Sequence, residues 1–383
     1  MQVDEERFRQ LMQEQRERAR SARKDAGADA WKGEGSAASG LEETVFTGYT
    51  QMEGEGKVTA IIQNGQRVDS AAEGAEVSVV LDATPFYGEG GGQVGDTGIL
   101  EAEGVSVDVV DTTKHEGVYL HRAVVSEGTL NVGDTLTAKV DEHRRTAIMR
   151  NHTSAHLLQK ALREVLGEHV HQAGSYEDDE RVRFDFTHFE ALTPEQIAQV
   201  EELANSYIMQ AIPTTRYETS LDEARNSGVT ALFGEKYGET VRVVEVGQFS
   251  RELCGGCHVN NTAEIGFVKI TSEGSVGASL RRIEAVTSYG ALAYVNGIEA
   301  ELRETAGLLS VPMFDVSERT ASNMTAYKEL QTRFKRTQNA VADDNVTALL
   351  DQAVLTPAGY PVIVAQVDVR DPGMLRNFWD VVR

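Results

Sequence analysis

The sequence predicts an α+β protein, in which a small antiparallel β-barrel is followed by an α+β domain, a helical arm and the start of a C-terminal α/β domain. Two observations predict this order. Between residues 44 and 140, short β-branched segments alternate with glycine-containing turns, which is typical of a closed antiparallel barrel. Between residues 141 and 289, helical and strand-like periodicities alternate, which indicates an α+β domain.

The first 43 residues predict a helix and a linker. Apolar residues of segment 1–26 fall on one stripe of an otherwise charged stretch, so we expect an amphipathic helix that packs against another element. Residues 27–43 are rich in small residues, which indicates a linker. The strand periodicity begins at residue 44 and is clearest in segments 58–62, 77–81 and 105–110.

A glycine-rich loop lies inside the predicted barrel at residues 85–96. Residues without side chains let backbone N–H groups approach a phosphate or a ribose closely. The same glycines would equally serve a wide hairpin loop that only needs positive φ. The spacing matches neither a Walker loop nor a dinucleotide-binding fingerprint, so both interpretations stay open for Gly90, Gly91, Gly92 and Gln93.

Local signals also mark the helices of domain 141–289. Apolar residues recur at helical spacing between residues 144 and 166. Two further helices are expected to begin at capping boxes, in which a hydroxyl side chain and a Gln or Glu three residues later satisfy free backbone N–H groups. These boxes begin at Thr193 and Ser220.

Two pairs of potential metal ligands fall within this domain. His152 and His156 are four residues apart on the predicted helix, so they share one face. Cys254 and His258 form a second pair far along the chain. Zinc prefers four nitrogen or sulfur ligands in a tetrahedron, often supplied by two short-spaced pairs. The spacing therefore predicts one Zn²⁺ ion bound by these four side chains.

Other interpretations of these residues stay open. Cys257 could replace His258, because Cys-x-x-Cys is itself a zinc spacing. Taken singly, the histidine pair is a common surface pattern and the cysteine pair is compatible with redox chemistry. A zinc peptidase is not expected, since Thr153 stands where that class of enzyme has glutamate. The ion would then be structural, or it would polarise a carbonyl or hold a substrate group.

Composition limits the partners and the location. With 60 acidic and 37 basic residues, the net charge is −23, which argues against a general nucleic-acid binder because phosphate neutralisation dominates such binding. RNA contacts would depend on local basic clusters. No apolar run approaches the ~20 residues of a membrane span, and the N-terminus lacks a signal peptide. We therefore expect a cytoplasmic protein with no membrane partner, and two closely spaced cysteines agree with a reducing compartment.

The residues after 289 predict a different architecture. Residues 290–356 predict a helical arm of two helices split by Pro312. Residues 357–383 predict a strand followed by a helix, as at the truncated start of an α/β domain.

The chain contains, in this order, the glycine-rich loop, His152-x-x-x-His156, segments 171–175, 183–186 and 233–238, Cys254-x-x-x-His258, and segment 281–285. In this order, these motifs resemble the editing half of the alanyl-tRNA synthetase family. The resemblance covers nearly the whole chain. It implies that segment 1–26 ends a tRNA-recognition region, and that the ATP-dependent aminoacylation domain is absent before residue 1, so we do not expect this chain to ligate alanine.

The resemblance implies a zinc-dependent aminoacyl-tRNA deacylase, which hydrolyses serine or glycine wrongly esterified to alanine-specific tRNA. A pocket that fits alanine cannot exclude glycine sterically and rejects serine only weakly, so a second, hydrolytic site supplies the missing discrimination. An oligomer formed through the C-terminal region is also compatible with the resemblance. A free-standing deacylase and a non-catalytic, zinc-stabilised tRNA-binding module remain alternatives.

The resemblance also implies roles for individual residues. Thr153 could accept the serine hydroxyl, or its own hydroxyl could bond the helix backbone. Gln172 could orient water or the substrate amine, or face solvent from a strand. The zinc ligands are His152, His156, Cys254 and His258, the loop facing them is Gly90, Gly91, Gly92 and Gln93, and the phosphate contacts are Lys236, Arg281 and Arg282.

Overall fold

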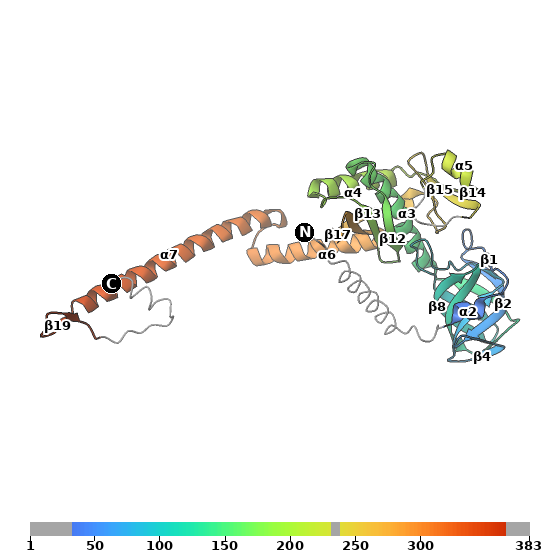
Figure 1. Ribbon diagram of the computed structural model, residues 1–383, viewed down its shortest axis with the longest axis horizontal. Coiled ribbons are helices and arrows are strands. Elements are labelled where there is room, and N and C mark those ends of the chain that lie inside the picture. Colours follow the sequence, from blue (N-terminus) through green and yellow to red (C-terminus); the bar gives the residue numbers. More distant parts are fainter. Residues whose placement is uncertain (1–32, 231–237, 365–383) are drawn as a thin grey trace, which may run out of the picture. The chain divides into compact units, whose positions relative to one another are not determined.

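The computed structural model describes residues 33–230 and 238–364 (Figure 1). The chain divides into two compact units, and the boundary in the sequence falls between Tyr294 and Val295. The predicted helix 1–26, Lys236 and most of segment 357–383 lie outside the described residues. Within the predicted linker, the described part contains a short helix, α2 (Glu34–Ala38). It packs on the barrel because Glu34 forms an ion pair with Arg122 and Ala38 is buried.

Six antiparallel strands close into a barrel, which confirms the predicted barrel. The closing contact is the pairing of the last strand with the first. A short strand, β3 (Gln66–Val68), extends the sheet beyond the barrel. In order around the barrel, the six strands are β11 (Thr135–Val140), β7 (Gly98–Ala102), β8 (Val105–His115), β9 (Val118–Glu127), β5 (Glu76–Leu81) and β2 (Glu53–Gln63).

Side chains that alternate along the strands fill the barrel. In β11, Leu136, Ala138 and Val140 are buried while the residues between them are partly exposed. This period of two follows from the pleat of a strand. Burying each larger aliphatic side chain contributes roughly 1.5–3 kcal/mol. Two short pairings lie outside the barrel sheet, β1 (Val45–Phe46) with β6 (Ala83–Thr84) and β4 (Ser70–Ala72) with β10 (Thr129–Asn131).

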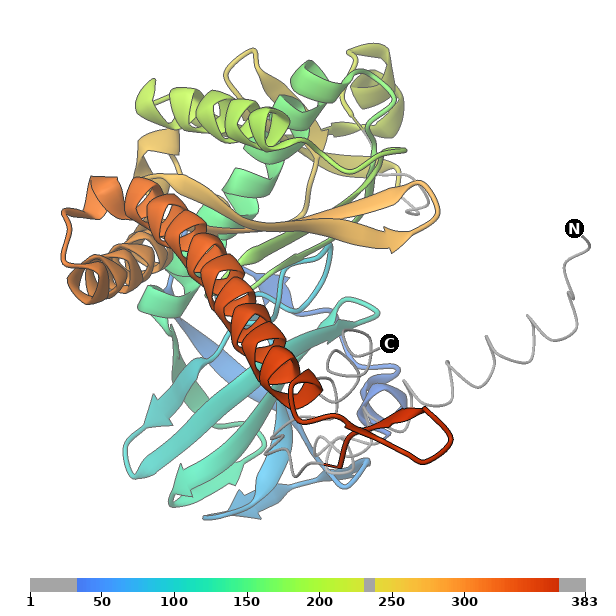
Figure 2. The same cartoon turned by 90° about the vertical axis from the view of Figure 1, so that its left-hand side faces the viewer.

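The following residues form a four-stranded antiparallel sheet with two helices on it (Figure 2). The long helix α3 (Glu142–Leu166) contacts three of these strands and also packs against α4 (Pro194–Met209). Phe184 and Phe186 are fully buried in the shared core. The order across the sheet is β12 (Gln172–Glu177), β13 (Val182–Thr187), β18 (Leu280–Thr287) and β17 (Val268–Gly277).

A second, three-stranded antiparallel sheet completes this mixed α/β region. Helix α5 (Leu221–Asn226) contacts two of its strands, and a 3-10 helix, η1 (Thr262–Ile265), contacts α3 and α4. Both predicted capping boxes are present, at Thr193 and Ser220. The order across the sheet is β14 (Thr214–Ser220), β15 (Thr240–Val246) and β16 (Ser250–Leu253).

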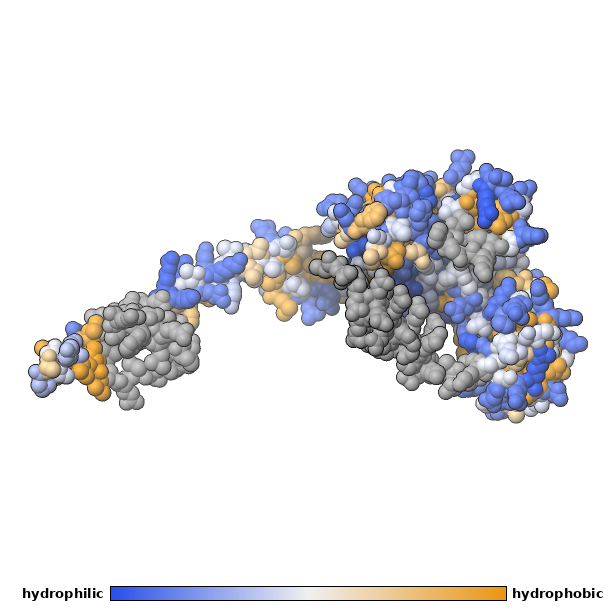
Figure 3. Space-filling view, in the orientation of Figure 1, coloured by the Kyte–Doolittle hydropathy of each residue, from blue (hydrophilic) through white to orange (hydrophobic). Residues whose placement is uncertain are grey.

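The last described residues are mainly helical. Pro312 separates α6 (Ser288–Leu309) from η2 (Met313–Asp315) and α7 (Val316–Leu350), and a short hairpin of β19 (Val354–Leu355) and β20 (Pro361–Val362) follows. Apolar side chains gather on the surface of α6, among them the exposed Leu292, Val295 and Ile298 (Figure 3). Among the described residues, none of the helices combines the length and the apolar character that crossing a membrane requires.

Candidate metal centre

Two elements bring three imidazoles and one thiol together. His152 and His156 lie one turn apart on α3, with their rings stacked 5.6 Å apart. Cys254 and His258 lie in the turn that follows β16. The potential ligand atoms of these four residues all lie within 4.8 Å of one another. The structure therefore brings together the four residues that the sequence spacing had paired.

Each imidazole is held by a hydrogen bond at Nδ1, so that Nε2 is turned toward the other potential ligands. A neutral imidazole that donates from Nδ1 keeps the lone pair of Nε2 free for a metal. Partners of this kind fix the ring orientation and the tautomer of metal-binding histidines. The bonds join His152 to Gln93 (2.9 Å), His156 to Glu252 (2.6 Å) and His258 to Thr153 (3.2 Å).

The inward-facing atoms form a compact set of donors. The Sγ atom of Cys254 lies 3.4 Å from Nε2 of His152 and 3.3 Å from Nε2 of His258. The Nε2 atom of His156 is buried and has no hydrogen-bond partner among the described residues. Three nitrogens and one sulfur without a carboxylate are a donor set that zinc prefers. These residues could therefore hold a zinc ion.

The two cysteines have opposite electrostatic surroundings. Burial raises the pKa of the Cys254 thiol, but the charges and hydrogen bonds of the nearby histidines lower it further, so that the pKa lies well below its usual value. Burial raises the pKa of Cys257 to about 11. Metal binding requires the thiolate form. The geometry agrees, because Cys257 is not one of the four grouped residues.

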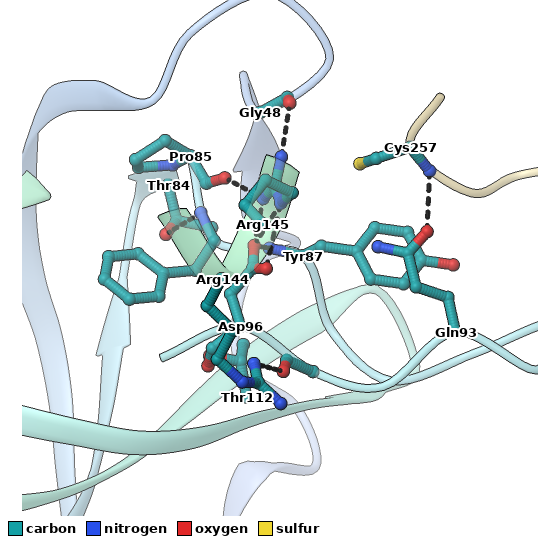
Figure 4. A network of polar contacts seen from close by, with 12 residues as sticks. Gly48, Thr84, Pro85, Tyr87, Gln93, Asp96, Thr112, Arg144, Arg145 and Cys257 are labelled. Carbon is teal, nitrogen blue, oxygen red and sulfur yellow. Dashed lines mark hydrogen bonds and ion pairs between the residues drawn. The ribbon is translucent and has the colours of Figure 1, made fainter. Parts of the chain in front are cut away.

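The glycine-rich loop places Gln93 beside these residues. Gln93 is fully buried, and its Oε1 accepts from the Cys257 N–H at 2.8 Å as well as from His152 (Figure 4). The loop pairs with β12 through two backbone hydrogen bonds between residues 92–94 and Glu177. Gly92 has φ +90°, and a Cβ there would overlap the Ser175 hydroxyl. A glycine is thus required both for its conformation and for the close approach.

The remaining predicted site residues lie in different surroundings. The buried Thr153 hydroxyl donates to the Met149 carbonyl at 2.7 Å and accepts from the Val259 N–H at 3.2 Å. Gln172 is half-buried at the start of β12, and its side chain has no hydrogen bond to a described residue. On the four-stranded sheet, Arg281 forms an ion pair with Glu273 and Arg282 forms one with Asp185.

Known protein families match two regions of the chain, and individual relatives match its whole length. The family described as tRNA synthetases class II (A) matches residues 1–144, and the family described as threonyl and alanyl tRNA synthetase second additional domain matches residues 241–284. Alanine–tRNA ligases of Pelotomaculum thermopropionicum, Alkaliphilus oremlandii and Bacillus subtilis are 46%, 45% and 42% identical over 100% of the chain. The chain belongs to the alanine–tRNA ligase family. It spans 43 to 44% of the length of these relatives.

The second matched region contains Cys254 and His258, whereas His152 and His156 lie between the two matched regions. Sequence reasoning missed Glu252, which is buried two residues before Cys254. An acidic residue so close to a predicted ligand is a signal, because ligating histidines commonly bond a carboxylate.

Glu177 was also missed, and no sequence pattern marks it. The side chain is fully buried on β12, and neither carboxylate oxygen has a hydrogen-bond partner among the described residues. Burial raises the pKa of Glu177. Its backbone pairs with Gln93, so a buried acid lies next to the residue that holds His152.

Proposed function

We propose that this chain contains a zinc-dependent editing site. The site hydrolyses the ester that joins serine or glycine to wrongly charged alanine-specific tRNA. The observation that carries the proposal is the group of three imidazoles and one low-pKa thiol, each imidazole oriented by its own hydrogen bond. Membership of the alanine–tRNA ligase family supports the choice of substrate, since alanine sites discriminate poorly against serine and glycine.

The proposed roles divide between ligands and positioning residues. His152, His156, Cys254 and His258 hold the zinc ion, which when bound supplies a Lewis acid for an ester carbonyl. Gln93, Glu252 and Thr153 keep the imidazoles in the tautomer and orientation that binding requires.

Gln93 has a second proposed role. Its Oε1 is occupied by two N–H groups, while its Nε2 is buried without a partner among the described residues. The amide therefore has N–H groups available to donate to an oxygen of the substrate. Gly90, Gly91 and Gly92 are retained as proposed parts of the site, and Gln172 is retained as a proposed contact for water or the substrate amine.

A deacylation assay with matched cysteine variants tests the proposal. The chain is expected to hydrolyse seryl-tRNA faster than buffer and to contain about one zinc ion per chain. Cys254→Ala should abolish turnover and lower the zinc content, because it removes a ligand. Cys257→Ala should keep its zinc, since this thiol lies outside the group.

Two outcomes would contradict parts of the proposal. If the wild-type chain leaves seryl-tRNA intact at the rate of buffer, the enzymatic function is wrong, and a non-catalytic zinc module replaces it. If Cys254→Ala keeps the wild-type zinc content, Cys254 is not a ligand.

A further inference from the structure

Three neighbouring cavities share Tyr49 and Arg242 in their walls. One, of 300 Å³, also borders Cys257 and His258. A second, of 500 Å³, borders Cys254. The third, of 340 Å³, borders Arg216 and Glu218. Arg216 also lines the first cavity. Ligand sites commonly have volumes of ~300–1,000 Å³, so these cavities offer ligand-sized space beside the candidate metal centre.

Arg242 is fixed in this wall by contacts that leave part of its guanidinium group free. The guanidinium carbon lies 3.9 Å from the centroid of the Tyr49 ring, and one nitrogen donates to the carbonyls of Cys254 (2.9 Å) and Gly256 (2.8 Å). The Tyr49 hydroxyl donates to the Gly255 carbonyl at 2.8 Å. The other two nitrogens of Arg242 have no partner among the described residues, so N–H groups remain for a ligand.

Arg216 lies on the same face of the three-stranded sheet. Its terminal nitrogens donate to the carbonyls of His258 and Val259 and to the side chain of Asn260 (2.9 Å). Its Nε is buried without a partner among the described residues. Arg216 and Arg242 both line two of these cavities, so two cationic side chains share one wall.

Neither arginine has a carboxylate within ion-pair distance in the described part of the chain, although acidic residues outnumber basic ones 60 to 37. The predicted phosphate contacts Arg281 and Arg282 differ, because Glu273 and Asp185 neutralise them. Two acidic residues line these cavities, Glu89 and Glu218, and both are exposed. Glu218 stands opposite Arg242 in the strand register. Two partly buried cations without a counter-charge indicate an anionic ligand.

We infer that Arg216 and Arg242 bind a phosphodiester of the single-stranded 3′ end of the substrate RNA, next to the candidate metal centre. This inference rests on the proposed function, because a reacting 3′-terminal ester brings the last phosphates of the RNA to this place. Arg242 keeps two nitrogens free among the described residues, and these match a phosphate as an arginine fork. Arg216 has only its Nε–H free and contributes mainly its positive charge. Cationic side chains combined with aromatic ones are the usual lining of grooves that bind single-stranded nucleic acid.

Binding of uncharged alanine-specific tRNA to the full chain tests the inference without requiring hydrolysis. Fluorescence anisotropy would give the Kd between about 50 and 200 mM salt. Arg216→Gln and Arg242→Gln are each expected to weaken binding about tenfold and to reduce the slope of log K against log salt by about 0.7. Glu218→Gln should act in the opposite direction and tighten binding, because it removes the competing negative charge.

Matched controls separate charge from structure. Arg67 also donates to two backbone carbonyls, those of Ala37 and Ser39, but borders none of the three cavities. Arg67→Gln should therefore keep the wild-type Kd and salt slope. Arg216→Lys keeps the positive charge and should recover most of the affinity, with zinc content measured in every variant.

The inference is overturned if both glutamine variants keep the wild-type Kd and salt slope, or if Arg216→Lys loses as much affinity as Arg216→Gln. The binding and hydrolysis assays together distinguish failure of this inference from failure of the proposed function. A wild-type chain that shows the arginine-dependent salt slope but does not hydrolyse seryl-tRNA keeps the inference and loses the function. A chain that hydrolyses seryl-tRNA but shows no binding difference between wild type and the arginine variants keeps the proposed function and loses the inference.

Discussion

Gly256, in the turn after β16, packs against the imidazole of His152. A Cβ at Gly256 would overlap that ring, whereas a Cβ at the neighbouring Gly255 would meet no atom within 4 Å. The two adjacent glycines therefore make a matched pair, in which the added methyl group is the same and only its surroundings differ.

Gly256→Ala is expected to lower zinc affinity and turnover by at least about tenfold, because His152 must move away from the other ligands. Gly255→Ala should behave as wild type. Zinc titration against a competing chelator and the deacylation rate would measure both. Equal affinities in the two variants would show that the turn can move without disturbing His152.

His121 is a second residue whose surroundings lead to a testable effect. It is fully buried in the barrel, and its Nδ1 lies 2.9 Å from the Val79 carbonyl. A carbonyl only accepts, so Nδ1 carries the proton and Nε2 accepts from the Thr84 hydroxyl at 2.7 Å. Burial lowers the pKa of His121 to about 4.

This lowered pKa should make the barrel less stable in acid. The unfolded chain binds a proton at His121 below its usual pKa of about 6.5, while the folded chain does so only near 4. The stabilisation is therefore complete above about pH 6.5 and declines as the pH falls toward 4. Between pH 7 and 5, wild type should lose about 2 kcal/mol more unfolding free energy than His121→Gln. Urea unfolding at both pH values measures this, and parallel losses would contradict it.

At the scale of elements, Arg145 joins α3 to the loops of the barrel. Its side chain is fully buried and pairs with Asp96, and it also donates to the carbonyls of Gly48 and Pro85 at 2.9 Å each (Figure 4). Since α3 also carries His152 and His156, this ion pair fixes the histidine helix against the glycine-rich loop that carries Gln93.

Asp96→Asn is expected to lower the free energy of unfolding by about 3–5 kcal/mol, because it leaves a buried guanidinium without its counter-charge. The control is Glu101→Gln, which breaks a half-exposed pair with Lys139 and should cost much less, because solvent screens that pair. Urea unfolding would compare the two variants with wild type. Similar losses in both would mean that the buried pair does not fix α3.

At the scale of the whole molecule, the barrel and the ligand-bearing region have separate hydrophobic cores. One core lies inside the barrel strands, and another joins α3, α4 and the four-stranded sheet. All four proposed ligands belong to the second region, so metal binding should stabilise the two regions unequally.

Removing the metal with a chelator should therefore lower amide protection in α3 and β16 while β8 and β9 keep theirs. Hydrogen exchange followed by mass spectrometry measures both regions in one sample, and added zinc should restore the lost protection. If chelation leaves the amide protection of α3 and β16 unchanged, the proposed zinc dependence is contradicted.

Local patterns were enough for several parts of this structure. The closed barrel follows from the period of two in its β-branched segments, and the capping boxes at Thr193 and Ser220 depend only on residues within one helical turn. By contrast, the helix α2 in the predicted linker depends on the distant partner of Glu34, Arg122, which no local pattern indicates.

The sequence by itself determined the barrel, the histidine helix and the two pairs of potential ligands, because each depends on spacing along a short segment. Only the tertiary structure decided which side chains pair with one another. Gln93 and Glu252 form hydrogen bonds with the imidazoles of His152 and His156. Arg281 and Arg282 form ion pairs with acidic residues. The tertiary structure also distinguished Cys254 from Cys257, whose pKa values shift in opposite directions. The physical reason is that burial and neighbouring charge, which decide such choices, arise only when segments far apart in the chain converge.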